Sequence, residues 1–224
     1  MSQPLYNKSV VCPVCEKEFK TLKVRSSAVK ILKRDEDFCT YYQDINPIFY
    51  DVFVCPECGY AAMEKYFETI SPMSVKDIKE KVASKWNRVD YCAQRTIEDA
   101  INCYKLSLYC SLIKGDKSSI IAATCLRLAW LYRYKGEKEE EKRFLKSALE
   151  NYIKAFNTEN FPIGKMTELE LMYLIGTLYY KLGSYKDAIQ WYSRVVSHPQ
   201  RRFYPVIISM AREQWYKLRE ANEE

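Results

Sequence analysis

The sequence predicts an α+β fold that is mostly α-helical, and two observations lead to this expectation. Two Cys-x-x-Cys pairs lie within the first 60 residues of the 224-residue chain. After Ser71-Pro72, turn-forming residues become sparse and apolar residues recur every three or four positions, the spacing of one helix face. We therefore expect a small zinc-ribbon-like β module over residues 1–72 and a domain of antiparallel helical hairpins over residues 73–224.

The two cysteine pairs, Cys12-Pro-Val-Cys15 and Cys55-Pro-Glu-Cys58, have the spacing of a four-cysteine zinc site. Each pair follows a run with β-branched residues, so a strand leading into a tight turn would place two sulfurs on one side. Four thiolates fill a tetrahedral shell and leave no position for substrate, so we expect one structural Zn²⁺ ion. A thioredoxin-type redox pair is the competing interpretation, but no βαβ pattern surrounds the cysteines. Iron on the same sulfurs stays open.

Between the pairs, the pattern predicts a three-stranded antiparallel ribbon with a long insertion. Residues 21–25 and 29–33 alternate as strands do, and residues 34–37 and Asn46-Pro47 are typical of turns. Cys39, a fifth cysteine of this module, is expected in the core, because free cysteines are among the most buried residues. Four later cysteines lie in apolar, helix-like patterns and are expected to be buried too: Cys92, Cys103, Cys110 and Cys125.

The helical domain is expected to begin near Ser74, a candidate N-cap. Two later segments repeat one pattern, in which an alanine precedes a tyrosine by four residues: Ala100 with Tyr104, and Ala188 with Tyr192. A small residue lets two helices approach closely while the tyrosine ring fills the next gap. The repetition indicates helical hairpins of one kind.

The helices preceding two hairpin turns are expected to end at Gly136 and Gly183. The combined spacing of glycine, alanine and tyrosine resembles the tetratricopeptide repeat, whose hairpins stack into a curved solenoid with a concave face. The earlier unit departs from the pattern at Glu141, where a small residue is expected, and the two glycines lie 47 residues apart. A helical bundle without repeats is the alternative.

If the repeat register holds, eight residues line a groove on the concave face. Arg133 and Lys181 fall at equivalent positions beside aromatic residues, an arrangement that could bind a carboxylate or an acidic peptide. The alternative is that both are ordinary surface residues with solvated charges. The expected groove residues are Leu126, Trp130, Arg133, Tyr134, Tyr173, Thr177, Tyr180 and Lys181.

Charge and cysteine usage restrict the partners and the compartment. The net charge is +6, divided into −1 over residues 1–72 and +7 over the remainder. Nucleic-acid binding is the alternative function, because basic residues lie at Arg201-Arg202 and in the ribbon, at Lys20, Lys23, Arg25, Lys30, Lys33 and Arg34. Nine cysteines, an odd number, and an N-terminus without an apolar signal region are typical of a reducing interior. We therefore expect a cytoplasmic protein without a membrane span.

The chain carries no recognisable catalytic constellation. His198 is the only histidine and follows an expected helix end, and no serine or cysteine motif accompanies it. The expectation is therefore that the protein is not an enzyme. An enzyme with an unrecognised site is the third hypothesis, and it would require a deep polar pocket where the ribbon meets the helices.

The segment from Val24 to Ala61 contains Asp35-Glu-Asp-Phe38-Cys39, Asn46-Pro47 and Cys55-Pro-x-Cys58-Gly59-Tyr60. It resembles a bacterial family of unknown function, number 2225, and the resemblance extends over nearly the whole chain. The resemblance implies a bacterial cytosolic protein with zinc-ribbon-like cysteines and tetratricopeptide-like helices, and it assigns no activity. Our hypothesis is a non-enzymatic, zinc-containing scaffold that binds a protein or peptide in the helical groove, with the ribbon as a rigid second surface.

Overall fold

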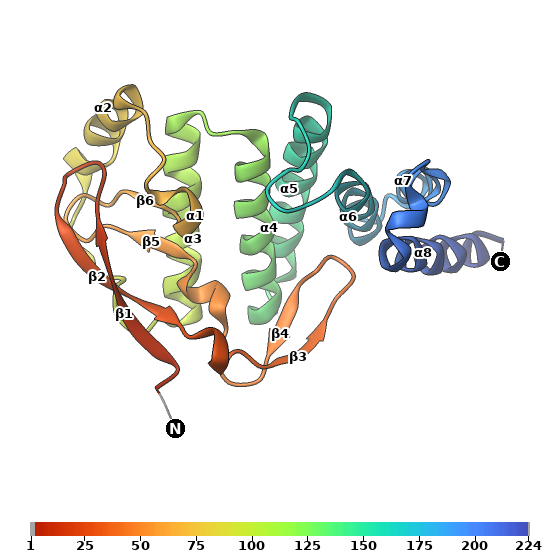
Figure 1. Ribbon diagram of the computed structural model, residues 1–224, viewed down its shortest axis with the longest axis horizontal. Coiled ribbons are helices and arrows are strands. Elements are labelled where there is room, and N and C mark those ends of the chain that lie inside the picture. Colours follow the sequence, from red (N-terminus) through yellow and green to blue (C-terminus); the bar gives the residue numbers. More distant parts are fainter. Residues whose placement is uncertain (1–2, 224) are drawn as a thin grey trace.

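The computed structural model describes residues 3–223, in which small strand pairs are followed by a succession of α-helices (Figure 1). The expected fold class, α+β and mostly α, is confirmed. Two of the three strand pairs lie toward one end of the long axis and the last two helices lie at the other, whereas the remaining strand pair lies near the middle.

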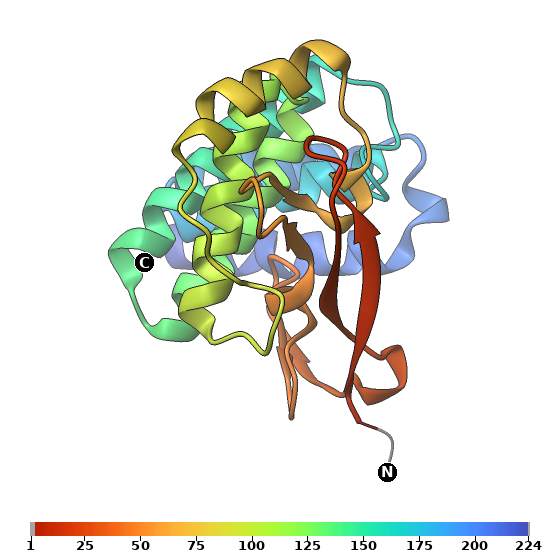
Figure 2. The same cartoon turned by 90° about the vertical axis from the view of Figure 1, so that its left-hand side faces the viewer.

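Within the described residues, the strands form three separate two-stranded antiparallel sheets rather than the three-stranded ribbon expected from the sequence. The middle hairpin leaves the others because Asp35 and Asp37 at its tip pair with Arg133, a residue of the helical part. Figure 2 shows the first hairpin as a long ribbon beside the helices. The pairs are β1 (Leu5–Val11) with β2 (Glu18–Val24), β3 (Ile31–Arg34) with β4 (Thr40–Tyr42), and β5 (Val52–Val54) with β6 (Ala61–Met63).

The helices from α3 onward pack mainly against their neighbours in the chain, as successive hairpins do. Figure 1 shows α3 and α4 upright and side by side, with α6 to α8 extending away from them. None of the helices in the described residues is long and apolar enough to cross a membrane. Their bounds are α1 (Glu64–Phe67), α2 (Pro72–Lys81), α3 (Ile97–Lys114), α4 (Ser118–Lys135), α5 (Lys138–Thr158), α6 (Glu168–Lys181), α7 (Tyr185–Ser197) and α8 (Pro205–Glu223).

Helix ends follow local chemistry, with one correction. The expected N-cap, Ser74, is wrong: α2 already begins at Pro72, and its N-cap is Ser71, whose hydroxyl accepts the N–H of Ser74 at 3.1 Å. Proline suits the first helical position because the N–H it lacks would have had no partner there. Gly136 ends α4 with a φ of 78°, and Gly183 follows α6 with a φ of 82°, as the sequence predicts.

The alanine–tyrosine pattern has the expected packing role. Ala100, Tyr104, Ala188 and Tyr192 are all fully buried. At Gly176, an added Cβ would lie only 3.0 Å from the ring of Tyr192. The small residue therefore lets α6 and α7 pack in close contact, with the tyrosine ring between them.

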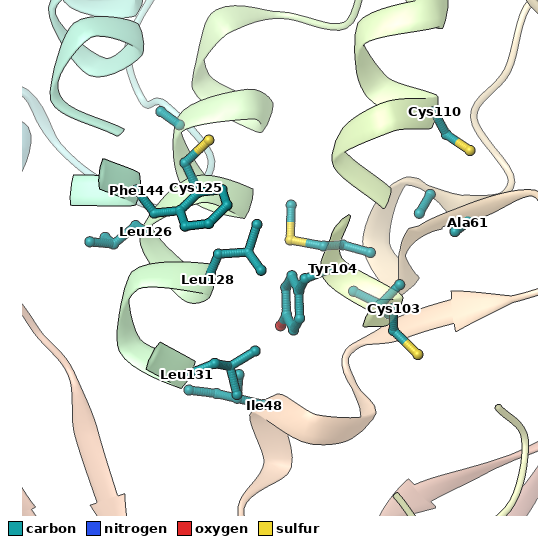
Figure 3. Packing of buried hydrophobic residues seen from close by; sticks show 14 of the residues in the cluster. Ile48, Ala61, Cys103, Tyr104, Cys110, Cys125, Leu126, Leu128, Leu131 and Phe144 are labelled. Atoms are coloured by element: carbon teal, nitrogen blue, oxygen red, sulfur yellow. The ribbon is translucent and has the colours of Figure 1, made fainter. Parts of the chain in front are cut away.

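One hydrophobic core extends from the strands through α3, α4 and α5 into α6. Figure 3 shows its centre, with Tyr104 of α3 lying toward Leu128 of α4 and Cys110 near Ala61 of β6. A second cluster joins α6, α7 and α8. The ribbon and the first helices therefore share one interior.

The later cysteines are buried as expected, apart from one. Cys103, Cys110 and Cys125 are at most 2% exposed. Cys92 is not helical: it lies half-buried in the extended segment before α3, where its carbonyl accepts the N–H of Leu22 at 3.0 Å. That segment joins β2 to the helical part.

Candidate metal centre and the occupied helical groove

The two cysteine pairs meet at one point of the fold. The four Sγ atoms lie within 4.8 Å of one another, with 3.6 Å between Cys12 and Cys58 and 3.5 Å between Cys15 and Cys55. Four sulfurs placed about 2.3 Å from one zinc ion in a tetrahedron would be about 3.8 Å apart. The cluster could therefore hold a single metal ion with four sulfur ligands.

The backbone of the two cysteine turns is nearly the same. Cys12 and Cys15 follow β1, Cys55 and Cys58 follow β5, and in each turn an N–H four residues after the first cysteine donates to its carbonyl, at 2.8 and 2.9 Å. The donors are Glu16, with a φ of 62°, and Gly59, with a φ of 71°. A glycine such as Gly59 is a sequence signal for a left-handed backbone, whereas glutamate gives none, so the matching role of Glu16 could not be recognised from the sequence.

The electrostatics of the cluster favour a cation. A hydrogen bond from the Cys12 thiol is the largest of the effects that hold the pKa of Cys55 well below its usual value, and the same contact raises the pKa of Cys12. Backbone N–H groups of Val14 and Cys15 act on Cys12 in the opposite direction. One thiolate is thus stabilised by protons on its neighbours, and a divalent cation would replace those protons.

Aromatic residues enclose the cluster. Tyr60 is fully buried, and its hydroxyl donates to the carbonyl of Phe67 at 3.1 Å. The Trp86 indole N–H donates to the carbonyl of Pro56 at 2.9 Å, and an added Cβ on Gly59 would lie 2.4 Å from the Trp86 ring. Sequence reasoning missed Trp86, whose one signal is a large aromatic residue in an otherwise polar run.

Cys39 takes no part in the cluster. It is fully buried, as expected, and its thiol donates to the Tyr134 hydroxyl at 3.4 Å. Burial raises its pKa to about 12. This cysteine is a core residue within the β3–β4 hairpin, directly before β4.

Five of the eight residues expected to line a peptide groove contact a segment of this same chain. The two Nη atoms of Arg133 donate to the two carboxylate oxygens of Asp37 at 2.9 and 2.6 Å, and Nη1 also donates to Asp35 at 3.0 Å. The Trp130 indole N–H donates to Asp37 at 3.2 Å. Burial alone would raise the pKa of Asp37, but the charge and hydrogen bonds of Arg133 hold it below its usual value.

Three further groove positions meet the same hairpin. The Tyr134 hydroxyl donates to the carbonyl of Thr40 at 2.8 Å. The rings of Tyr173 and Phe38 lie 5.7 Å apart, and the Lys181 ammonium lies 3.9 Å from the carboxylate of Glu36. The tip of the β3–β4 hairpin thus places an acidic and aromatic segment against α4 and α6.

The remaining groove positions have other surroundings. Leu126 is buried beside a cavity, and Tyr180 is 38% exposed. The Thr177 hydroxyl donates to the carbonyl of Tyr173 and accepts from Tyr192, each at 3.0 Å, so it belongs to the packing of α6 on α7.

Glu141, the residue that departs from the repeat pattern, also belongs to this cluster. It accepts a hydrogen bond from Nε of Arg133 at 2.7 Å. Three carboxylates therefore surround one guanidinium, and the bidentate pair with Asp37, whose side chain is fully buried, lies at its centre. A planar guanidinium suits such bidentate contacts.

Comparison with known sequences places the chain among bacterial proteins. A protein from Borreliella burgdorferi described as "Uncharacterized protein" is 27% identical over 154 residues, which make up 60% of this chain and 55% of that protein. The matched chain thus spans about half the length of this relative. The profile of the family "Uncharacterized protein conserved in bacteria (DUF2225)" matches residues 5–218. The chain belongs to this family.

Proposed function

We propose that this protein is a non-enzymatic interaction scaffold, in which one structural zinc ion holds the cysteine turns and tetratricopeptide-like hairpins carry a groove for an acidic, aromatic peptide segment. The observation that supports it is the hairpin tip, Asp35-Glu36-Asp37-Phe38, seated against Arg133 and Trp130. This tip is acidic, as expected of a ligand of the groove. We infer that it occupies the groove within the molecule and that a partner protein with a similar segment would displace it.

Zinc is the proposed metal because four sulfurs close its coordination shell and suit a structural site. Elemental analysis of protein purified without chelators should find one zinc ion per chain. Iron at the same stoichiometry would replace that part of the proposal and leave the groove unaffected.

The groove can be tested by weakening its internal occupant. In an Asp35→Asn/Asp37→Asn variant the hairpin tip loses the two carboxylates that pair with Arg133, whereas Arg133 is unchanged. A labelled peptide with the sequence of residues 31–42 should bind this variant more tightly than wild type, because the tethered hairpin competes at an effective concentration of about 1 mM. Fluorescence anisotropy measures both affinities.

Two matched controls make this result specific. Adding Arg133→Glu to the opened variant should abolish peptide binding, whereas Arg143→Glu, at an exposed position of α5, should leave it intact. A peptide with both aspartates replaced by asparagine should bind poorly. If the opened variant keeps its metal and its circular dichroism but takes up no peptide, the groove function is wrong.

A second candidate, nucleic-acid binding, is favoured by one surface near the C-terminus. Arg201, Arg202 and Arg212 line a pocket of about 300 Å³, beside Phe203, which is 81% exposed. In the ribbon, by contrast, several basic residues lie near carboxylates, including Lys23, whose ammonium is 2.7 Å from Glu64. Salt-sensitive retention on RNA or heparin that disappears in an Arg201→Glu/Arg202→Glu/Arg212→Glu variant would favour this candidate.

A further inference from the structure

A cavity of about 420 Å³ lies where the ribbon meets the helices. Its walls come from the β5–β6 region with α1, from α4 and α5, from the loop between α5 and α6, and from the tip of the β3–β4 hairpin. These elements can be followed in Figure 1. Cavities of this size bind small organic molecules in other proteins.

The lining has an apolar part that suits a hydrophobic group. Leu126 and Trp130 line it from α4, Leu174 from α6, Phe38 from the hairpin and Met166 from the loop between α5 and α6. Leu126, Trp130 and Leu174 are at most 9% exposed and are fixed in the core. An aromatic or branched aliphatic group would therefore meet a preformed surface.

Arg127 lies on the polar part of the lining with most of its donors unused. Its Nη1 donates to the carbonyl of Ala123 in the same helix at 3.2 Å, and its Nε lies 3.8 Å from Asp51, beyond hydrogen-bond distance. A guanidinium has five N–H groups. About 30% of the Arg127 side chain is exposed, and the residue lines the cavity. Its free N–H groups could therefore form a bidentate contact with an anion.

The charges around the cavity favour an anion over a cation. Both carboxylate oxygens of Glu64 are occupied, one by Lys8 and the other by Lys23, each at 2.7 Å. Two further lysines line the cavity from opposite elements, Lys65 in α1 and Lys165 in the loop between α5 and α6.

Asp51 is the one carboxylate left beside the guanidinium. Burial raises its pKa, and the charges of Arg127 and Lys23 only partly oppose this effect. The Lys23 ammonium, 3.8 Å from Oδ1 of Asp51, offsets part of the negative charge beside the guanidinium.

We propose that this cavity binds a small organic anion, with its apolar body against Leu126 and Trp130 and its carboxylate, sulfonate or phosphate group on Arg127. The cavity shares Phe38, Leu126 and Trp130 with the proposed peptide groove. Its anion contact is separate, because Arg127 makes no hydrogen bond or ion pair with the hairpin among the contacts of the described residues. It would give the protein a small-molecule ligand at the junction of its two parts.

The probe is 8-anilinonaphthalene-1-sulfonate, an aromatic anion, compared with N-phenyl-1-naphthylamine, which has the same rings and no sulfonate. Isothermal titration with the metal-loaded 224-residue chain measures both. Arg127→Met should weaken sulfonate binding by about 10-fold or more, the value of a charge-assisted contact, and change the affinity for the neutral amine by less than about twofold. Ala123→Phe, which fills the cavity, should weaken both.

Arg143→Met is the matched control and should leave both affinities unchanged, since that side chain is exposed on α5 and pairs with Glu140. If Arg127→Met loses metal or helicity, Arg127→Lys, which keeps the charge without the planar fork, should give an intermediate loss. The proposal is overturned if wild type binds no dye at about 1 mM, or if Ala123→Phe and the Arg127 variants bind it as wild type does. Peptide binding by the opened groove should be unaffected by Arg127→Met, so the two proposals fail separately.

Discussion

Arg133 connects the β3–β4 hairpin to the helices through a single guanidinium. It hydrogen-bonds to three carboxylates, of Asp35, Asp37 and Glu141, although only 12% of its side chain is exposed. Removing charges from water costs free energy that the ion pair only partly returns. The cluster therefore contributes mainly to the position of the hairpin. Removal of Arg133 alone would lower the stability of the protein, because a carboxylate would be left buried without a partner.

Arg133→Met should destabilise the protein by about 3 kcal/mol or more, because Asp37 would stay fully buried without its cation. Arg133→Met/Asp37→Leu should regain much of that loss, since neither charge remains. Urea unfolding of the two variants measures the difference. Arg143→Met, at an exposed position, should change stability by less than about 0.5 kcal/mol. Equal stability of the single and double variants would contradict this account.

Substitutions at the two residues with positive φ in the cysteine turns should change the stability of the protein in opposite directions. Gly59→Ala should cost about 2 kcal/mol or more, because a Cβ there meets Trp86 as well as a left-handed backbone. Glu16→Gly, at the matching position of the other turn, should stabilise by up to about 1 kcal/mol by relieving the same strain. Thermal unfolding of the metal-loaded proteins measures the change in stability of each variant. A harmless Gly59→Ala would show that the turn and Trp86 can rearrange.

At the scale of elements, the helices were predictable because their signals are local. Capping residues, terminal glycines and small residues four positions from an aromatic one specify α3 to α7 within a few neighbouring residues. The place of the β3–β4 hairpin was not predictable, since Asp37 and Arg133 are 96 residues apart in the chain. The sequence separately indicated an acidic turn at residues 34–37 and a groove with Arg133 and Lys181. Neither pattern shows that the turn packs into the groove.

The docking of this hairpin should depend on pH through Asp37. Its pKa is lower in the folded protein than the usual value of about 3.9, so its stabilising contribution is present above that pH. The contribution is lost as the pH falls through the folded pKa. The indole N–H resonance of Trp130, which donates to Asp37, should therefore shift with a midpoint below about pH 3.9, and Asp37→Asn should abolish the shift.

The metal centre provides the control for this titration. Thiolates also take up protons in acid, and their loss of metal should be reported by the indole of Trp86, which donates to Pro56 in the second cysteine turn. If the Trp86 and Trp130 resonances shift with different pH midpoints, then loss of the metal and protonation of Asp37 are separate events. A Trp130 midpoint above about pH 3.9 would show that Asp37 is not the titrating group.

At the scale of the whole molecule, the four-cysteine cluster is coupled to the helices through a shared interior. Val54, Tyr60 and Ala61 of the second cysteine turn belong to the same hydrophobic cluster as Tyr104 of α3 and Leu128 of α4. The cluster of α6, α7 and α8 lies farther along the chain. Loss of the cysteine turns should therefore expose part of the surface on which α3 packs and leave the last helices less affected.

Removal of the metal by a chelator at neutral pH should thus destabilise α3 along with the ribbon. A structural zinc site can contribute on the order of 10 kcal/mol of apparent folding free energy, comparable with the whole stability of many domains. Hydrogen exchange should show lost protection in β5, β6 and α3 and greater retention in α7. Cys55→Ser should reproduce the effect, whereas Cys92→Ser, outside the cluster, should keep the metal. Full protection of α3 in metal-free protein would mean that hydrophobic packing alone holds the ribbon in place.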